Sequence, residues 1–140
     1  MKTFRTEIMI NAPAPVVWRV LTDKGMLLSG DFAITRIEGE IAENAPIKLW
    51  SEAAPDRAFA LKVVEFDAPS RMVWQGGMPL GLFTGTRQFS VTTAGAGTEF
   101  AMQEDFTGLM SGLITKSMPD LQPFFDRFSA ALKHKAEDIV

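Results

Sequence analysis

The stretch TRQFSVTTAGAGTEFAMQEDF, residues 86–106, predicts a β-hairpin from which the fold can be worked out. Apolar and polar residues alternate on both sides of a central turn, AGAG at residues 94–97, which is typical of a half-buried antiparallel pair of strands. A turn at this position sets Thr93 opposite Thr98 and thereby fixes all later cross-strand pairs. The hairpin therefore has a predicted register before any other element is considered.

Two charged residues fall on the apolar face of this hairpin. In the predicted register Arg87 lies opposite Glu104, on the same face as the pair formed by Phe89 and Met102. One interpretation is a structural ion pair, which by itself is weak evidence for stability. The other is a pair of polar groups that orients a ligand in an apolar pocket. The sequence leaves both interpretations open.

Composition narrows the class of protein. The chain has 140 residues, which is the length of one domain, and we expect residues 1–140 to form a single domain. Hydrophobic residues make up 46% and charged residues 22%, as in ordinary globular proteins. The net charge of −3, with lysines and arginines scattered along the chain, argues against a nucleic-acid partner.

Several kinds of site and location are not expected. There is no cysteine, and the one histidine, His134, stands between two lysines on the polar side of a predicted helix. No carboxylate cluster has metal-ligand spacing, so we expect neither a metal nor a cofactor. The first residues, MKTFRTEIMI, carry three charges and no long apolar run, unlike a signal peptide or a membrane span. A cytoplasmic protein without a membrane span is the expectation.

The pattern of the N-terminal and central parts of the chain predicts one strand, then two short helices, and then only strands. Residues 3–11 alternate as a strand, two prolines then introduce a helix over residues 14–22, and a second helical turn ends near Gly30. Short β-rich runs separated by turn residues follow. These predicted strands span residues 32–40, 46–51, 57–66, 71–77, 83–93 and 98–107.

The pattern becomes helical after Gly108. Apolar residues recur every three or four positions and predict a long amphipathic helix, whose buried stripe is Leu121, Phe125, Phe128, Leu132 and Ala136. Prolines at positions 119 and 123 predict a break near residues 116–118.

This order predicts an α+β protein: a curved seven-stranded antiparallel sheet around a long C-terminal helix, with two small helices after the first strand. Four glycines supply curvature instead of bulk where the sheet bends, which favours a cavity between sheet and helix. They are Gly76, Gly77, Gly81 and Gly85.

Several stretches carry a family resemblance. They are INAPAPVVWRVLTD (10–23), RIEGEIAENAPIKL (36–49), PSRMVWQGGMPLGLFTGTRQFSV (69–91), GTEFAMQEDFTGLM (97–110) and LQPFFDRFSAALKHKAE (121–137). In order and spacing they resemble the SRPBCC domains of the START and Bet v 1 superfamily, in particular the polyketide cyclase/dehydrase-like group. The resemblance implies a helix-grip fold with a deep hydrophobic cavity for lipids, sterols, polyketides or other apolar small molecules.

The resemblance also bears on the two charged residues. Glu104, followed by Phe106 and Gly108, matches an E-x-F-x-G pattern of the family, whereas many relatives have a histidine where Arg87 stands. A role in acid–base chemistry therefore does not transfer to Arg87.

The cavity would be lined by residues on the inner face of the sheet and of the C-terminal helices. Each is also explained by ordinary core packing. With Arg87 and Glu104, the expected ligand-binding residues are Phe59, Leu61, Met72, Trp74, Phe89, Met102, Phe106, Met110, Ile114, Met118 and Phe125.

Three functions remain open. The first is intracellular binding of a hydrophobic small molecule, apolar or weakly acidic, with Arg87 and Glu104 as the polar minority. The second is a cyclase- or hydratase-type enzyme with Glu104 as general acid or base. The adjacent arginine argues against this function, because it would hold the carboxylate ionised and hydrogen-bonded. The third is an interaction protein like the activators of chaperone ATPases, which would need a large exposed apolar or charged face.

Overall fold

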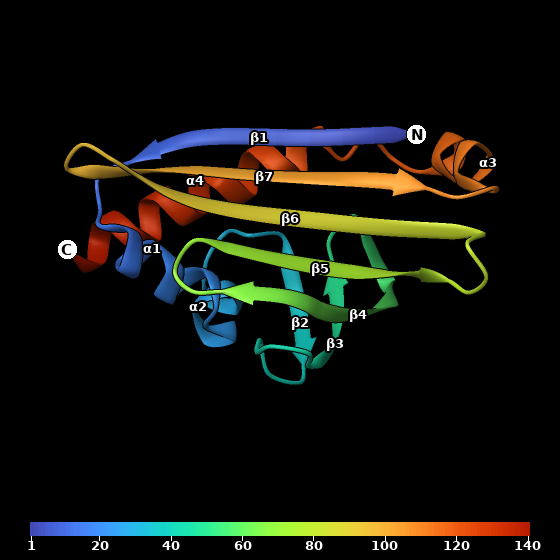
Figure 1. The fold of residues 1–140 in the computed structure, drawn as a ribbon, viewed down its shortest axis with the longest axis horizontal. Coiled ribbons are helices and arrows are strands. Elements are labelled where there is room, and N and C mark those ends of the chain that lie inside the picture. Colours follow the sequence, from blue (N-terminus) through green and yellow to red (C-terminus); the bar gives the residue numbers. More distant parts are fainter.

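The computed structural model describes residues 1–140 and contains seven strands and four helices (Figure 1). In chain order these are β1 (Lys2–Ile10), α1 (Ala14–Leu21), α2 (Lys24–Ser29), β2 (Ile34–Glu38), β3 (Pro46–Ser51), β4 (Ala54–Asp67), β5 (Arg71–Met78), β6 (Phe83–Ala94), β7 (Gly97–Thr107), α3 (Ser111–Ser117) and α4 (Gln122–Ile139).

All seven strands form one antiparallel sheet in the order β1-β7-β6-β5-β4-β3-β2. The sheet curls, and α4 lies on its concave side together with α1 and α2 (Figure 1). This is the predicted helix-grip arrangement. None of the helices is long and apolar enough to cross a membrane.

The register predicted for the central hairpin is confirmed. Thr93 pairs with Thr98, and Arg87 pairs with Glu104 six residues further from the turn. Gly95 in the turn has φ +61, a conformation that glycine adopts without a steric penalty and that suits a two-residue hairpin loop. The side-chain alternation and the turn chemistry therefore agree on one register.

The predicted pairs of Val63 with Trp74 and of Leu61 with Gly76 are also present between β4 and β5. The ladder shifts between Val63 and Glu65, so that Val64 is an extra, exposed residue. This bulge bends β4, which contributes to the curl of the sheet.

Two predicted strand boundaries need correction. The strand expected at residues 32–40 begins only at Ile34, because Phe32 turns inward against Phe128, at 5.0 Å between ring centroids, and Ala33 has φ +61. The strand expected at residues 57–66 is longer, Ala54–Asp67.

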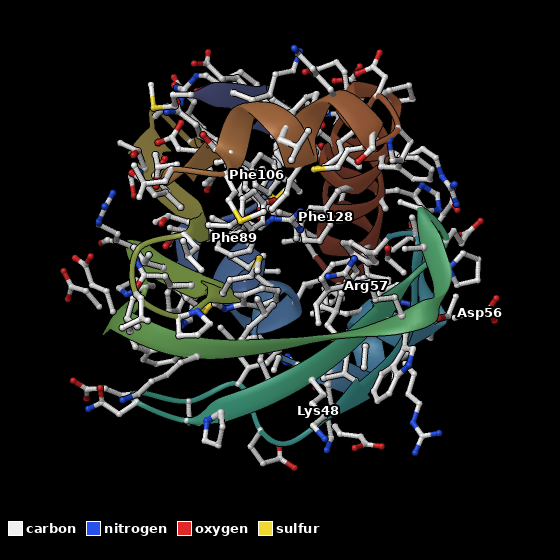
Figure 2. The ribbon with its side chains drawn as sticks, turned by 90° about the vertical axis from the view of Figure 1, so that its right-hand side faces the viewer. Lys48, Asp56, Arg57, Phe89, Phe106 and Phe128 are labelled. Carbon is white, nitrogen blue, oxygen red and sulfur yellow. The ribbon has the colours of Figure 1, made fainter.

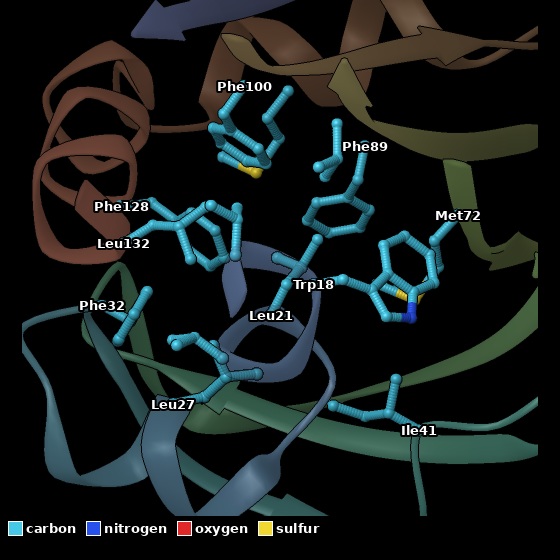
Figure 3. Close-up of a cluster of buried hydrophobic side chains, with 14 of the residues drawn as sticks. Trp18, Leu21, Leu27, Phe32, Ile41, Met72, Phe89, Phe100, Phe128 and Leu132 are labelled. Carbon is cyan, nitrogen blue, oxygen red and sulfur yellow. The ribbon is translucent and has the colours of Figure 1, made fainter. Parts of the chain in front are cut away.

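The main core lies between the sheet and the helices (Figure 3). Four residues of the predicted stripe face the sheet on α4, with Phe125, Phe128, Leu132 and Ala136 each at most 2% exposed. The fifth, Leu121, lies at the N-cap of α4 and is only half-buried. The predicted break is present as well, since α3 ends at Ser117 and α4 begins at Gln122. A buried hydrogen bond of 2.9 Å between the hydroxyls of Thr6 and Ser129 joins α4 to β1.

The end of β5 depends on a glycine. Gly77 has φ +145, and a Cβ built there would lie 2.2 Å from the carbonyl oxygen of Phe83 on β6. We expect Gly77→Ala to lower the free energy of unfolding by at least about 2 kcal/mol, because the backbone conformation is open only to glycine and the two strands would have to separate.

Urea denaturation measures this effect against a matched control. Gly81 also has positive φ, +67, but a Cβ at this residue would meet no atom within 4 Å, so Gly81→Ala should cost only about 1 kcal/mol. Equal losses for the two variants would contradict the close approach of β5 and β6.

Candidate functional site

The candidate site is built on three neighbouring strands. Cross-strand pairing sets Trp74 of β5, Arg87 of β6 and Glu104 of β7 in one row on the concave face. Side chains on alternate positions of paired strands point to the same face, so this row follows from the register alone. Trp74 Nε1 is the one buried side-chain polar atom without a hydrogen-bond partner.

Arg87 and Glu104 form a hydrogen-bonded ion pair. Arg87 donates from Nε and Nη2 to the same oxygen, Oε1 of Glu104, at 3.0 and 2.7 Å. The guanidinium also lies over the ring of Phe125 of α4, 4.9 Å from its centroid. The two charged side chains are 22% and 14% exposed, respectively. Arg87 Nη1 and Glu104 Oε2 make no hydrogen bond within the protein, so each remains available to another molecule.

Gly85 makes room for this carboxylate. A Cβ at residue 85 would lie 3.1 Å from Oε2 of Glu104 and 3.2 Å from the ring of Phe106. At Gly76 the corresponding space is occupied by Leu61, 2.6 Å away. At Gly76 and Gly85, neighbouring side chains therefore occupy the space that a larger residue would take.

The residues expected to line a cavity fall into two groups. The deeper group belongs to the packed core. A residue that lined a space large enough for water would have solvent-accessible surface, whereas these residues are at most 6% exposed. They are Met72, Trp74, Phe89, Met102, Phe106 and Phe125. The shallower group is half-buried or exposed and comprises Phe59, Leu61, Met110, Ile114 and Met118.

Accessible surface on the concave face is concentrated at one end. We call this region the concave opening and define it by Phe59, Leu61, Phe83, Arg87 and Glu104, all on concave-face positions and all at least partly accessible. Figure 2 looks into this end of the molecule, with α3 crossing above it. Apart from the ion pair, the residues that define the opening are apolar.

Arg57 was missing from the residues expected at the site. It stands two positions before Phe59 on β4, so strand alternation places both on the concave face, and its guanidinium lies 5.3 Å from the Phe59 ring centroid. In Figure 2 Arg57 points inward, whereas Asp56 and Lys48 point outward. Arg57 has no carboxylate partner. The alternation that nominated Phe59 and Leu61 was the signal that could have found it.

The concave face of the sheet carries more positive than negative charge. Its charged residues are Lys2 opposite Phe106, Arg57, and Arg87 opposite Glu104. Three cations thus face one carboxylate, in a chain whose net charge is −3. An anion entering the opening would meet a favourable electrostatic environment.

A surface pocket of about 460 Å³ lies away from the concave opening, on the outer side of α4. Its lining is mostly polar, and its arginine, Arg127, is engaged by Asp31 and Glu52, whose hydrogen bonds raise the pKa of the guanidinium. His134, also in this lining, is an exposed surface residue as expected. No group of three or more His, Cys, Asp or Glu side chains is placed to hold a metal ion.

Comparison with solved structures finds the same fold in distant proteins. The hypothetical protein jhp0584 from Helicobacter pylori is 13% identical, with a TM-score of 0.79 over 96% of this chain and 88% of that one. The Zhui aromatase/cyclase from Streptomyces sp. R1128 is 13% identical, with a TM-score of 0.76 over 97% and 93%. TTHA0849 from Thermus thermophilus is 16% identical, with a TM-score of 0.72 over 99% of both chains.

Family assignment rests on the sequence. No curated protein matches the chain. The model of a family described as polyketide cyclase / dehydrase and lipid transport matches residues 1–137. That match covers nearly the whole chain, and it agrees with the curled sheet and closing helix described above. The chain belongs to the polyketide cyclase/dehydrase and lipid transport family.

Proposed function

We propose that the protein binds an apolar small molecule that carries an anionic or weakly acidic group, with its apolar part in the concave opening and its acidic group at Arg87. The observation that carries this proposal is the position of the ion pair: Arg87 and Glu104 are the polar groups of an otherwise apolar opening, and Arg87 Nη1 has no partner in the protein. A few placed polar groups in an apolar lining are typical of small-molecule sites.

The surrounding charge supports an acidic ligand. Glu104 holds two of the three nitrogens of the Arg87 guanidinium in a fixed orientation, and Phe125 supports the guanidinium plane from the helix side. A carboxylate or phenolate oxygen could accept a hydrogen bond from the third nitrogen. Arg57, unpaired at the rim, adds a second positive charge on the path into the opening.

The packing of the concave face limits where the ligand would lie and which shapes would suit it. Because the middle of the concave face is filled by core side chains, the ligand would lie against the shallower residues, chiefly Phe59, Leu61 and Phe83. Two half-buried methionines that flank α3, Met110 and Met118, can adapt their shape to it. A flat or elongated apolar molecule would suit such a shallow site better than a compact one.

The proposal is tested with two fluorescent probes that differ in charge. 1-Anilinonaphthalene-8-sulfonate carries an anionic sulfonate, and N-phenyl-1-naphthylamine is its neutral counterpart. In the double variant Arg87→Met with Glu104→Leu, the affinity for the anionic probe should fall by about 1–3 kcal/mol, because the guanidinium that would pair with the sulfonate is gone. The affinity for the neutral probe should stay unchanged.

The double variant should remain folded, since replacing a paired arginine and glutamate by apolar residues of similar volume is often neutral or stabilising. Thermal unfolding followed by circular dichroism checks this. Equal affinity of the parent and the double variant for the anionic probe would contradict the proposal and leave the ion pair with a structural role alone.

A second candidate function is enzymatic, because Glu104 Oε2 makes no hydrogen bond and could transfer a proton. The Zhui protein, whose fold this chain shares, is an aromatase/cyclase. Glu104→Gln keeps the shape of the side chain and removes its proton-accepting form. Turnover of a linear poly-β-ketone that is lost in this variant, while affinity for the anionic probe persists, would favour the enzyme.

A further inference from the structure

Two loops at one end of the molecule present leucine side chains to solvent. Leu80, in the turn between β5 and β6, is 91% exposed, and Leu109, between β7 and α3, is 88% exposed. Leu113, on the outer side of α3, is 69% exposed. We call these three residues the leucine tip. Both loops lie at the same end of the sheet as the concave opening (Figure 1).

The leucine tip is held together by backbone hydrogen bonds. Leu109 N donates to the carbonyl of Gly81 at 3.2 Å, and Met110 N donates to the carbonyl of Leu82 at 2.8 Å. The two loops are therefore joined in one surface, although they are about 30 residues apart in the sequence. Exposed apolar residues are ordinary when scattered, but a group fixed at one place marks an interaction site.

Leu80 is held in an unfavourable backbone conformation. Its φ is +63, in the left-handed region that leucine rarely adopts and that glycine or asparagine adopts more readily. The chain thus combines a strained backbone with a fully exposed apolar side chain at the same residue. Neither feature stabilises the fold, which points to a function outside the folded monomer.

The charges around the leucine tip indicate what it meets. Residues 77–83 and 107–117 contain a single charged residue, Lys116, near the end of α3. Lys2, at the start of β1, lies opposite Phe106 at the same end of the sheet. Exposed leucines with flanking lysines are typical of segments that lie at the surface of a membrane with anionic lipids.

We propose that the leucine tip docks the protein on a bilayer that contains anionic phospholipids, with Leu80, Leu109 and Leu113 entering the interface and Lys116 contacting the headgroups. Leu80 and Leu109, which are 91% and 88% exposed, and Leu113, which is 69% exposed, protrude from the surface. Three protruding leucine side chains bury too little area for a stable protein–protein interface, which needs about 1,200–2,000 Å². A fluid bilayer, by contrast, accommodates them without a complementary surface.

This docking would place the concave opening next to the membrane, because Phe83, which belongs to the opening, directly follows the loop of Leu80, and the half-buried Met110 directly follows Leu109. An apolar ligand could then move between bilayer and protein with little exposure to water. Membrane docking by the leucine tip does not require ligand transfer, and it is tested independently of the ligand binding proposed for the concave opening.

The experiment is co-sedimentation of the full chain with vesicles of phosphatidylcholine and phosphatidylglycerol, and with vesicles of phosphatidylcholine alone. We expect binding to the anionic vesicles, weaker binding to the neutral ones, and reduced binding to the anionic vesicles at high salt because surface charges are then screened. Absence of binding to the anionic vesicles would overturn the proposal.

Variants separate the leucine tip from apolar exposure in general. The triple variant Leu80→Asn, Leu109→Ser and Leu113→Ser should bind anionic vesicles at least about tenfold more weakly. Met9→Ser with Val64→Ser, which changes two exposed apolar residues on other surfaces, should bind like the parent. Lys116→Glu should weaken binding by about fivefold or more. Equal binding of the triple variant and the parent would overturn the proposal.

Further measurements check that the leucine-tip variants stay folded and that the leucine tip is not a dimer interface. Leu80→Asn alone should leave the melting temperature unchanged or raise it, because asparagine tolerates the left-handed conformation better than leucine does. The leucine-tip variants should retain affinity for the anionic naphthalene probe, which shows that the concave opening is intact. Concentration-dependent dimers that disappear in the triple variant would assign the leucine tip to a second copy of the chain and overturn membrane docking.

Discussion

Replacing Phe128 with alanine is expected to lower the free energy of unfolding by about 3–5 kcal/mol, as large-to-small changes of buried aromatic residues do. Phe128 lies on α4 and is 2% exposed. Its ring contacts Phe32, Phe89 and Phe100, with centroids 5.0, 6.1 and 6.2 Å away. The residue therefore joins the helix to the sheet and to the segment before β2, and alanine would leave a cavity among the three rings.

Urea denaturation measures the loss, with Phe124→Ala as a matched control. Phe124 is on the same helix but only half-buried, so its truncation should cost less than half as much. A loss below about 1 kcal/mol for Phe128→Ala would mean that the surrounding rings collapse into the space or that the helix is not anchored at this point.

Removing Arg87 alone is expected to destabilise the protein by about 3 kcal/mol. In Arg87→Met the carboxylate of Glu104, whose side chain is 14% exposed, loses both of its charge-assisted hydrogen bonds and remains largely buried without a partner. Leaving one partner of a largely buried pair without the other is among the most destabilising single changes.

Comparing the stability of the single and double variants separates two effects: the cost of leaving the Glu104 carboxylate without a partner, and the contribution of the ion pair to the free energy of unfolding. Arg87→Met with Glu104→Leu should unfold at the same denaturant concentration as the parent or at a higher one, so the second substitution should restore what the first removed. A double variant as unstable as the single one would show that the ion pair itself stabilises the fold, as a structural pair would.

Sequence periodicity determined the fold and the register. Alternation in residues 86–106 and the turn at Gly95 fixed the pairing of Arg87 with Glu104, because a shift by one residue would move every apolar side chain of the hairpin to the outer face. The break between α3 and α4 followed from two prolines, and the buried face of α4 from its helical repeat. These features depend on nearby residues in the sequence, so local physical chemistry specified them.

Long-range packing decided the details of the site. Periodicity assigns Phe59 and Phe89 to the same face, but only the structure shows that Phe89 is enclosed by Trp74 and Phe128 whereas Phe59 is open to solvent. Which concave-face residues remain accessible depends on how far α4 and its neighbours cover the sheet. That coverage is set by the volumes of side chains from distant segments, which no local pattern contains.

The sequence by itself determined an α+β helix-grip chain of the polyketide cyclase/dehydrase type, with Arg87 and Glu104 paired on its inner face. Only the tertiary structure decided that accessible surface is concentrated at one end, that Arg57 points into it, and that the loops of Leu80 and Leu109 are joined beside it. Alternation fixes the face to which a strand residue points, whereas exposure and the meeting of separate loops depend on the position of the whole chain in space.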